Sequence, residues 1–168
     1  VYSELSRDGE LLVYDLCCGK SYLSFAVYYY LTEVKGRSVR LLGVDLKRDV
    51  IDYCARIARE CGFSGMQFIY DDVKNTPRDR CPDMVISLHA CDIATDIVIN
   101  TAADFGAKVI LSTPCCHHDL NKKLNCEPLA FISDYSMLRQ KLCDAATDAL
   151  RLKLMEAMGL SRLQRQME

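Results

Sequence analysis

The chain of 168 residues lacks an apolar run long enough to span a membrane, although half of its residues are apolar. It also lacks an excess of positive charge, because 21 Lys and Arg residues face 23 Asp and Glu residues. We therefore expect no membrane partner and no general electrostatic surface for nucleic acid, so that a polyanion would need a local basic patch or another domain. The length predicts one domain over residues 1–168 with its own hydrophobic core.

Two signals of exported proteins are also missing. No basic and apolar leader precedes the first strand-like segment, and the chain begins with Val1 instead of Met, so we expect a domain cut from a longer chain. The ten cysteines lie as adjacent pairs and single residues within strand and helix patterns, and not as a framework of loops. This pattern predicts a reducing compartment, such as the cytoplasm.

Glycine-rich motifs that hold phosphate are absent. The P-loop motif G-x-x-x-x-G-K-[ST] would need its first glycine at Tyr14, although Gly19, Lys20 and Ser21 match its end. The dinucleotide motif G-x-G-x-x-G fails too, because Gly19 is the only one of its glycines present. Pyrophosphate binding is therefore disfavoured. A P-loop, a turn without a ligand and a site for a nucleoside without phosphate remain as alternatives.

Strand-length and helix-length segments alternate along the chain. The expected strands are Leu11–Asp15, Val39–Asp45, Met66–Tyr70, Met84–Ser87 and Lys108–Ser112. The expected helices are Tyr22–Val34, Asp49–Cys61, Asp92–Phe105 and Ser133–Met158, with Asp49, Asp92 and Ser133 or Asp134 as candidate caps. This alternation predicts βαβ units and an α/β fold with a mostly parallel sheet.

Carboxylates lie at the ends of the first two expected strands, as Asp15 and Asp45. The carboxyl ends of parallel strands form the edge at which such sheets bind ligands, and an acid after the second strand accepts the hydroxyls of a ribose. Each bond to a charged acceptor contributes roughly 1.5 to 3 kcal/mol. S-adenosyl-L-methionine carries no phosphate and needs only one close backbone approach beside such an acid. It is therefore the favoured ligand, with its amino group facing Asp15.

Four segments, DLCCGKSYLSFAVYYYL, GVDLK, ISLHACDIATD and STPCCHHDL, together resemble the class I S-adenosylmethionine-dependent methyltransferase domain family over about residues 11–159. They are similar to bacterial methyltransferase-domain proteins, to the glutathione S-transferase C-terminal-domain-containing protein and to tRNA ribose methyltransferases with a Cys-Cys-His-His stretch. The resemblance implies a Rossmann-like three-layer sandwich and an RNA acceptor, either tRNA or rRNA. Such families usually have glycine where this chain has Cys17, so the turn must tolerate a side chain there.

The resemblance also implies a set of cofactor contacts. Asp72 would lie near the adenine amino group, with Asp71 as an alternative, whereas Lys47 could equally be a solvated lysine. The expected cofactor-binding residues are Asp15, Cys17, Cys18, Gly19, Lys20, Ser21, Asp45, Lys47, Asp72 and Leu88.

The end of the fourth strand is the place where methyltransferases present groups to the methyl acceptor. His89 is the best available base there, because histidine titrates near neutral pH, although it could instead only support the turn. Asp92 would orient His89 or cap the following helix. These two residues are predicted to be catalytic, together with His117 from the next loop.

The Cys-Cys-His-His stretch follows the fifth expected strand. We predict that His117 and Cys115 contact the same cleft as His89, within a loop that shapes the substrate site. Zinc is disfavoured, because structural sites usually space their ligands two to four residues apart. A thiolate that adds to a pyrimidine is disfavoured too, because no Asp-Pro-Pro-Cys element follows the fourth strand. No metal is therefore predicted.

A complete class I methyltransferase continues past its last helix into two more strands, whereas residues 160–168 have little β-branched content. We therefore expect a sheet that lacks these strands and an exposed edge that a homodimer could cover. Two functions compete with an RNA methyltransferase. One is a non-catalytic module that holds cofactor or a partner on a methyltransferase fold, and the other is a methyltransferase that acts on protein or a small molecule.

Overall fold

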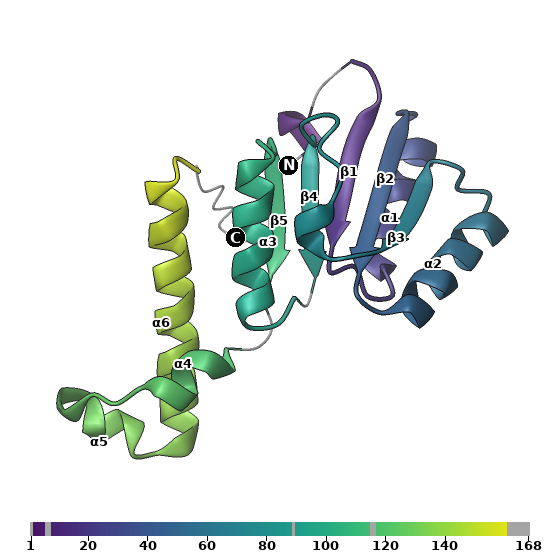
Figure 1. The fold of residues 1–168 in the computed structure, drawn as a ribbon. Coiled ribbons are helices and arrows are strands. Elements are labelled where there is room, and N and C mark those ends of the chain that lie inside the picture. The colour runs from purple at the N-terminus through teal and green to yellow at the C-terminus, as the bar shows by residue number, and fades with distance from the viewer. Residues whose placement is uncertain (1, 6–7, 89, 115–116, 161–168) are drawn as a thin grey trace.

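The centre of the molecule is a five-stranded parallel sheet (Figure 1). The computed structural model describes residues 2–5, 8–88, 90–114 and 117–160. The strands are β1 (Leu11–Leu16), β2 (Val39–Asp45), β3 (Met66–Tyr70), β4 (Met84–Leu88) and β5 (Val109–Thr113), in the order β3-β2-β1-β4-β5. Each predicted strand agrees with its observed counterpart to within one residue at either end. The α/β fold with a parallel sheet is confirmed.

The described part of the chain also contains six α-helices and four other short helical turns. The α-helices are α1 (Tyr22–Tyr29), α2 (Arg48–Glu60), α3 (Ile93–Asp104), α4 (His118–Lys123), α5 (Ala130–Ser133) and α6 (Ser136–Ala157). The turns are η1 (Tyr2–Glu4), the π-helical η2 (Tyr30–Val34), η3 (Val73–Asn75) and η4 (Glu127–Leu129). None of the helices in the described ranges is both long and apolar enough to cross a membrane.

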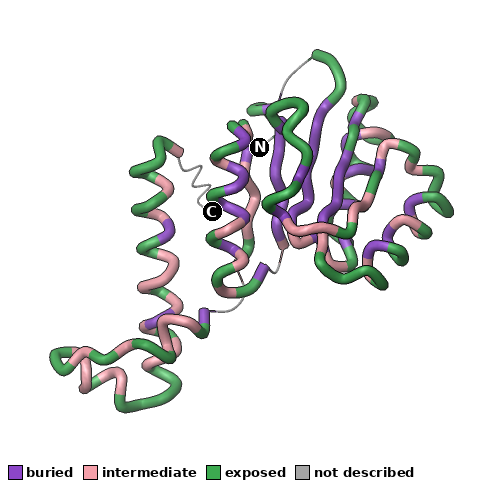
Figure 2. The backbone as a smooth tube through the Cα atoms, in the orientation of Figure 1, coloured by how far each residue is buried: buried purple, intermediate pink, exposed green. Residues whose placement is uncertain are grey.

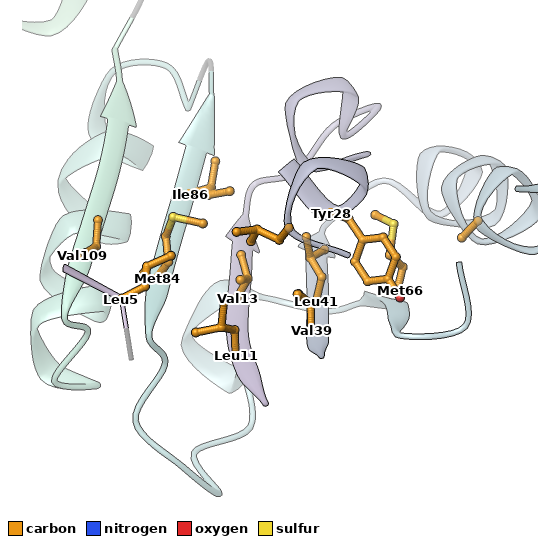
Figure 3. Close-up of a cluster of buried hydrophobic side chains, with 12 residues drawn as sticks. Leu5, Leu11, Val13, Tyr28, Val39, Leu41, Met66, Met84, Ile86 and Val109 are labelled. Atoms are coloured by element: carbon orange, nitrogen blue, oxygen red, sulfur yellow. The ribbon is translucent and has the colours of Figure 1, made fainter. Parts of the chain in front are cut away.

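Helices cover both faces of the sheet and give it three layers. Alternate side chains of a strand point to opposite faces, so the wholly buried β1 contributes to two cores. On one face, Leu11 and Val13 pack with Leu41 and with Tyr28 from α1 (Figure 3). A second cluster on the other face joins β1, β2 and β4 to α3. Figure 2 shows β1 and β2 buried over nearly their whole length.

The strand order reverses between β1 and β4. After β1 the chain moves outward through β2 to β3, and it then returns to β4 and β5 on the other side of β1. Connections that leave in opposite directions open a crevice beyond the carboxyl ends of these strands. The topology therefore places the turn after β1, the end of β2 and the end of β4 around one opening.

The helix predictions needed corrections at their ends. The expected helix Tyr22–Val34 changes from α-helical to π-helical hydrogen bonding at Tyr30. The residue at the cap of α2 is Lys47 and not Asp49, and α6 begins at Ser136, beyond the predicted caps. Short helix α4 was not predicted, because six residues carry too little periodicity to be recognised.

The two outer strands, β3 and β5, each pair with one neighbour only. Among the described residues the sheet contains no antiparallel strand, in agreement with the expected lack of the last strands. Between β3 and β4 the chain forms only the short turn η3 and a loop, so no long helix covers the sheet there. The homodimer that would cover an exposed edge stays a prediction.

Candidate cofactor site and reaction cleft

A cavity of about 590 Å³ opens at the carboxyl ends of β1, β2 and β4, at the point where the strand order reverses. Its volume lies within the range of small-molecule sites. All ten residues that were predicted to bind the cofactor line it: Asp15, Cys17, Cys18, Gly19, Lys20, Ser21, Asp45, Lys47, Asp72 and Leu88. The structure therefore brings the whole predicted set together around one space.

Asp45, the last residue of β2, is tied to the backbone on both sides. Its Oδ2 accepts the N–H of Gly19 at 2.9 Å, and its Oδ1 accepts the N–H of Lys47 at 3.0 Å. Each carboxylate oxygen can accept more than one hydrogen bond, so both oxygens retain capacity for a ligand. Held in this way, the half-buried carboxylate borders the cavity in one fixed orientation.

The turn after β1 has an unusual backbone. Cys17 and Ser21 have φ angles of 60° and 53°, and Gly19 has φ 50°. A side chain in this left-handed region costs roughly 1 to 2 kcal/mol. The N–H of the next residue, Cys18, donates to the carbonyl of Val44 at 3.0 Å, and this hydrogen bond joins the turn to β2. Nothing lies within 4 Å of a Cβ placed on Gly19, so the backbone there is open to a ligand.

Asp15, at the end of β1, is almost fully buried. Its Oδ2 accepts hydrogen bonds from the hydroxyls of Ser21 at 2.8 Å and Ser24 at 2.6 Å. Burial raises the pKa of Asp15 to about 6, although the two hydroxyls act in the opposite direction, and the nearby charge of Asp45 raises it further. At neutral pH the carboxylate is therefore largely ionised and lies beneath the turn.

Three thiols surround the same turn. Burial raises the pKa of Cys17 and of Cys54 to about 11, and it also raises the pKa of Cys18. These thiols stay protonated at neutral pH and are not nucleophiles. The Cys54 thiol donates to the carbonyl of Gly19 at 3.4 Å. Neither Cys54 nor Ser24 was predicted to take part, because nothing in a helix pattern indicates which turn its residues will contact.

Asp72 and the residues after it form another wall. Its Oδ1 accepts the N–H of Lys74 at 2.9 Å and so caps the turn η3. Asp71 instead accepts the N–H of Asp72 and the side-chain amide of Asn75, and it is not among the residues that line the cavity. Of the two acids considered from the sequence, Asp72 is therefore the one at the cavity.

The predicted catalytic residues have different positions. His89 and Cys115 lie outside the described residues. Asp92 has a φ of 56° and precedes α3, but its side chain makes no hydrogen bond to the first turn of that helix. Its Oδ1 instead accepts the N–H of Asp119 at 3.2 Å. The prediction that the Asp92 side chain caps helix α3 was therefore wrong. Asp92 thus joins the loop after β4 to helix α4.

His117 was predicted to contact the cleft, but the structure places it between α4 and α6. The ring is buried, with Nε2 at 2.9 Å from Asp148 and Nδ1 at 3.5 Å from Asp144, both on α6. It is not among the residues that line the cavity. The carboxylates of Asp144 and Asp148 hold the ring in this position. They lie 27 and 31 residues further along the chain, so nothing in the sequence indicated that they would pair with His117.

Helix α6 is also tied to the loop at the cleft through Arg151. This buried guanidinium donates to Asp96 on α3 at 2.6 and 3.0 Å and to the carbonyl of Asp92 at 3.0 Å. Hydrogen bonds and charge from Asp96 raise the pKa of Arg151. Arg151 was not predicted, since a single arginine on a helix usually points to solvent.

No group of three metal-ligating side chains occurs within the ranges that the structure describes. The zinc hypothesis is not tested by this result, because Cys115 and Cys116 lie outside those ranges. The eight described cysteines are all free thiols.

The chemistry of the cavity fits a nucleoside that carries positive charge and no phosphate. Three carboxylates line it, which suits hydroxyl, amino and sulfonium groups, and apolar side chains such as Leu46, Val73 and Ile97 complete its walls. The open backbone at Gly19 allows the close approach that the turn requires. The residues present therefore fit S-adenosyl-L-methionine.

A search among curated proteins finds no match. Among solved structures, the chain is similar to coclaurine N-methyltransferase bound to N-methylheliamine and SAH, with 14% identity and a TM-score of 0.44 over 61% of this chain and 28% of that one. It is also similar to the PH0226 protein from Pyrococcus horikoshii OT3, with 26% identity and a TM-score of 0.42 over 57% of this chain and 42% of that one.

The chain thus spans less than half the length of either solved structure. The sequence model of a family described as "Methyltransferase domain" matches residues 1–123, which is most of the chain and contains every residue of the cavity. The chain therefore belongs to the methyltransferase domain family.

Proposed function

We propose that this chain binds S-adenosyl-L-methionine in the cavity and transfers its methyl group to RNA. The observation that carries the proposal is the position of Asp45, which borders the cavity at the tip of β2 with both oxygens fixed by backbone N–H groups. A carboxylate at this position in a parallel sheet accepts ribose hydroxyls. The family match supports methyl transfer.

Each wall of the cavity would hold a different part of the cofactor. Asp45 accepts the ribose hydroxyls, while Asp72 and Val73 lie where the adenine would fit. The buried charge of Asp15 attracts the amino group toward the turn. When bound, S-adenosyl-L-methionine supplies an electrophilic methyl group on a sulfonium. The protein then contributes alignment of the acceptor and removal of its proton.

The acceptor would approach from the end of β4, past Leu88, Ala90 and Cys91. His89 is the proposed base in this segment. Asp92 acts as a positioning residue, because its carboxylate and carbonyl hold the loop to α4 and α6. The ring of His117 is bound by α6, so we do not assign it a catalytic role.

An RNA acceptor is supported by exposed basic side chains at the opening, although three carboxylates also line the cavity and the net charge of the chain is −2. Lys20 and Lys47 line the cavity and are exposed. The guanidinium of Arg48, which follows Lys47 in the sequence, lies 5.6 Å from the ring centre of exposed Tyr70. Lysines that neutralise phosphates beside an aromatic ring form a common arrangement for single-stranded RNA.

The test has two parts. Calorimetry with S-adenosyl-L-methionine and its demethylated product should show binding to the wild-type chain, and no heat at millimolar ligand would refute the cofactor assignment. Transfer of labelled methyl from the cofactor to total RNA, but not to total protein, should then occur. Label in protein or small molecules would refute the RNA acceptor. Cofactor binding without any incorporation would instead favour the non-catalytic module.

A further inference from the structure

A second hollow, separate from the cofactor cavity, runs along the outer edge of β3. Its volume is about 680 Å³, and its walls come from β2, β3, α2 and Pro77 in the loop before β4. Along β3 the wall contains four consecutive residues, Met66, Gln67, Phe68 and Ile69. Because neighbouring residues of a strand point to opposite faces, this hollow must extend around the strand edge. We call it the β3 groove.

Beyond Met66, the outward backbone groups of β3 pair with no other residue in the ranges that the structure describes. The carbonyl of Gly65 accepts from the N–H of Leu41, and the N–H of Asp71 donates to the carbonyl of Asp45, so the odd-numbered residues bond toward β2. In a parallel pair these directions alternate, and the backbone groups of Phe68 and Tyr70 therefore point outward. Such groups are a template for another extended chain.

The groove has room for an added chain because its walls carry small residues. Ala55, Ala58 and Gly62 share one face of α2 and its end, at spacings of three and four residues. On the opposite face, only the loop with Pro77 follows η3, so no helix fills the space beside Ile69.

The charge of the groove selects the kind of chain. Among the described residues that line it, only Arg40 on β2 and Arg59 in the last turn of α2 are charged, and both are exposed. Neither has an ion pair with another residue in the described ranges. Two cations and no carboxylate on the walls are complementary to acidic side chains.

A peptide fits these walls better than RNA does. The ring of Phe68 packs on Phe25 at 5.9 Å between ring centres, and the ring of Phe63 packs on Tyr28 at 5.0 Å. The aromatic rings of the groove are therefore engaged in the core and offer no free platform on which bases could stack. The open backbone edge, in contrast, matches the hydrogen bonds of an extended peptide.

We propose that the β3 groove binds an extended, acidic segment of a partner protein, which adds to the sheet beside β3. Its backbone bonds to Phe68 and Tyr70, its acidic side chains contact Arg40 and Arg59, and its apolar side chains enter the groove. This site lies outside the cofactor cavity, so the proposal does not depend on methyl transfer.

The test uses the full chain and a fluorescent octapeptide that alternates valine and glutamate, with binding followed by anisotropy. We expect saturable binding that weakens at least 10-fold in Arg40→Glu/Arg59→Glu. Lys122→Glu/Lys141→Glu, which makes the same charge change at exposed positions of α4 and α6, should bind as the wild type does. The same peptide with methylated backbone nitrogens should lose affinity, because it cannot complete the strand pairing. A valine–lysine octapeptide should not bind.

Several results would overturn the proposal. They are absence of binding by the valine–glutamate peptide, equal binding by the double variant, and equal binding by the methylated peptide. Oligouridylate that binds the wild type and is lost in Arg40→Glu/Arg59→Glu would assign the groove to RNA instead. Self-association in sedimentation that is lost in the same variant would assign it to a second copy of the chain. Circular dichroism of each variant separates a loss of binding from a loss of folding.

Discussion

Replacing Asp45 tests the proposed ribose contact most directly. In Asp45→Asn the side chain keeps its shape but has only one acceptor oxygen, whereas the carboxylate accepts N–H bonds from both Gly19 and Lys47. One of these backbone donors would then face an amide NH₂. Asp45→Ala removes both acceptors and the charge.

The magnitude follows from the number of bonds lost. Two ribose hydroxyls bonded to a charged acceptor contribute about 3 to 6 kcal/mol together, which corresponds to a loss of about 140- to 20,000-fold in affinity. Since Asp45 is only half buried, we expect Asp45→Ala to lie near the lower limit. Asp45→Asn should lose less, because one neutral hydrogen bond remains.

The assay is calorimetric titration of S-adenosyl-L-methionine and its demethylated product into each variant. Asp52→Ala is the matched control, because it removes the same charge from an exposed position of α2. Urea unfolding of each variant separates loss of binding from loss of folding. A loss below 3-fold in a stably folded Asp45→Ala chain would refute the ribose contact and the reasoning built on it.

Three further changes have defined outcomes. Because the pKa of Asp15 is raised from 3.8 to about 6, the wild type should lose up to about 3 kcal/mol of stability between pH 4 and 6 as that proton dissociates. The variant Asp15→Asn should not show this loss. If the urea midpoints of the wild type and Asp15→Asn differ by the same amount at every pH, the raised pKa of Asp15 is contradicted. In Gly43→Ala the new Cβ would lie 2.6 Å from Cε1 of Phe68, so we expect about 1 to 3 kcal/mol of destabilisation, and an unchanged urea midpoint would be inconsistent with this packing. Arg151→Met removes the bonds to half-exposed Asp96 and should cost about 1 to 3 kcal/mol by thermal unfolding, whereas an unchanged Tm would show that the pair contributes nothing.

Much of the candidate cofactor site could be predicted because it depends on local patterns. Apolar segments of strand length place Asp15 and Asp45 at strand ends, and parallel strands bring their carboxyl ends to one edge. The resemblance added Asp72 and the concern about Cys17, whose φ of 60° shows that a side chain does occupy this left-handed position. These residues lie at or just after the ends of strands, so their place in the sequence also gives their place at the edge of the sheet.

The sequence by itself thus determined the parallel sheet and the acids at the ends of its strands, because the period of apolar residues defines each strand and its end. Only the tertiary structure decided the partners of His117 and Arg151, which are bound by carboxylates on other helices. It also decided that Arg40 and Arg59, 19 positions apart in the sequence, share one groove. The physical reason is that such contacts depend on how helices pack against a sheet, and the local periodicity that forms a helix does not specify its neighbours.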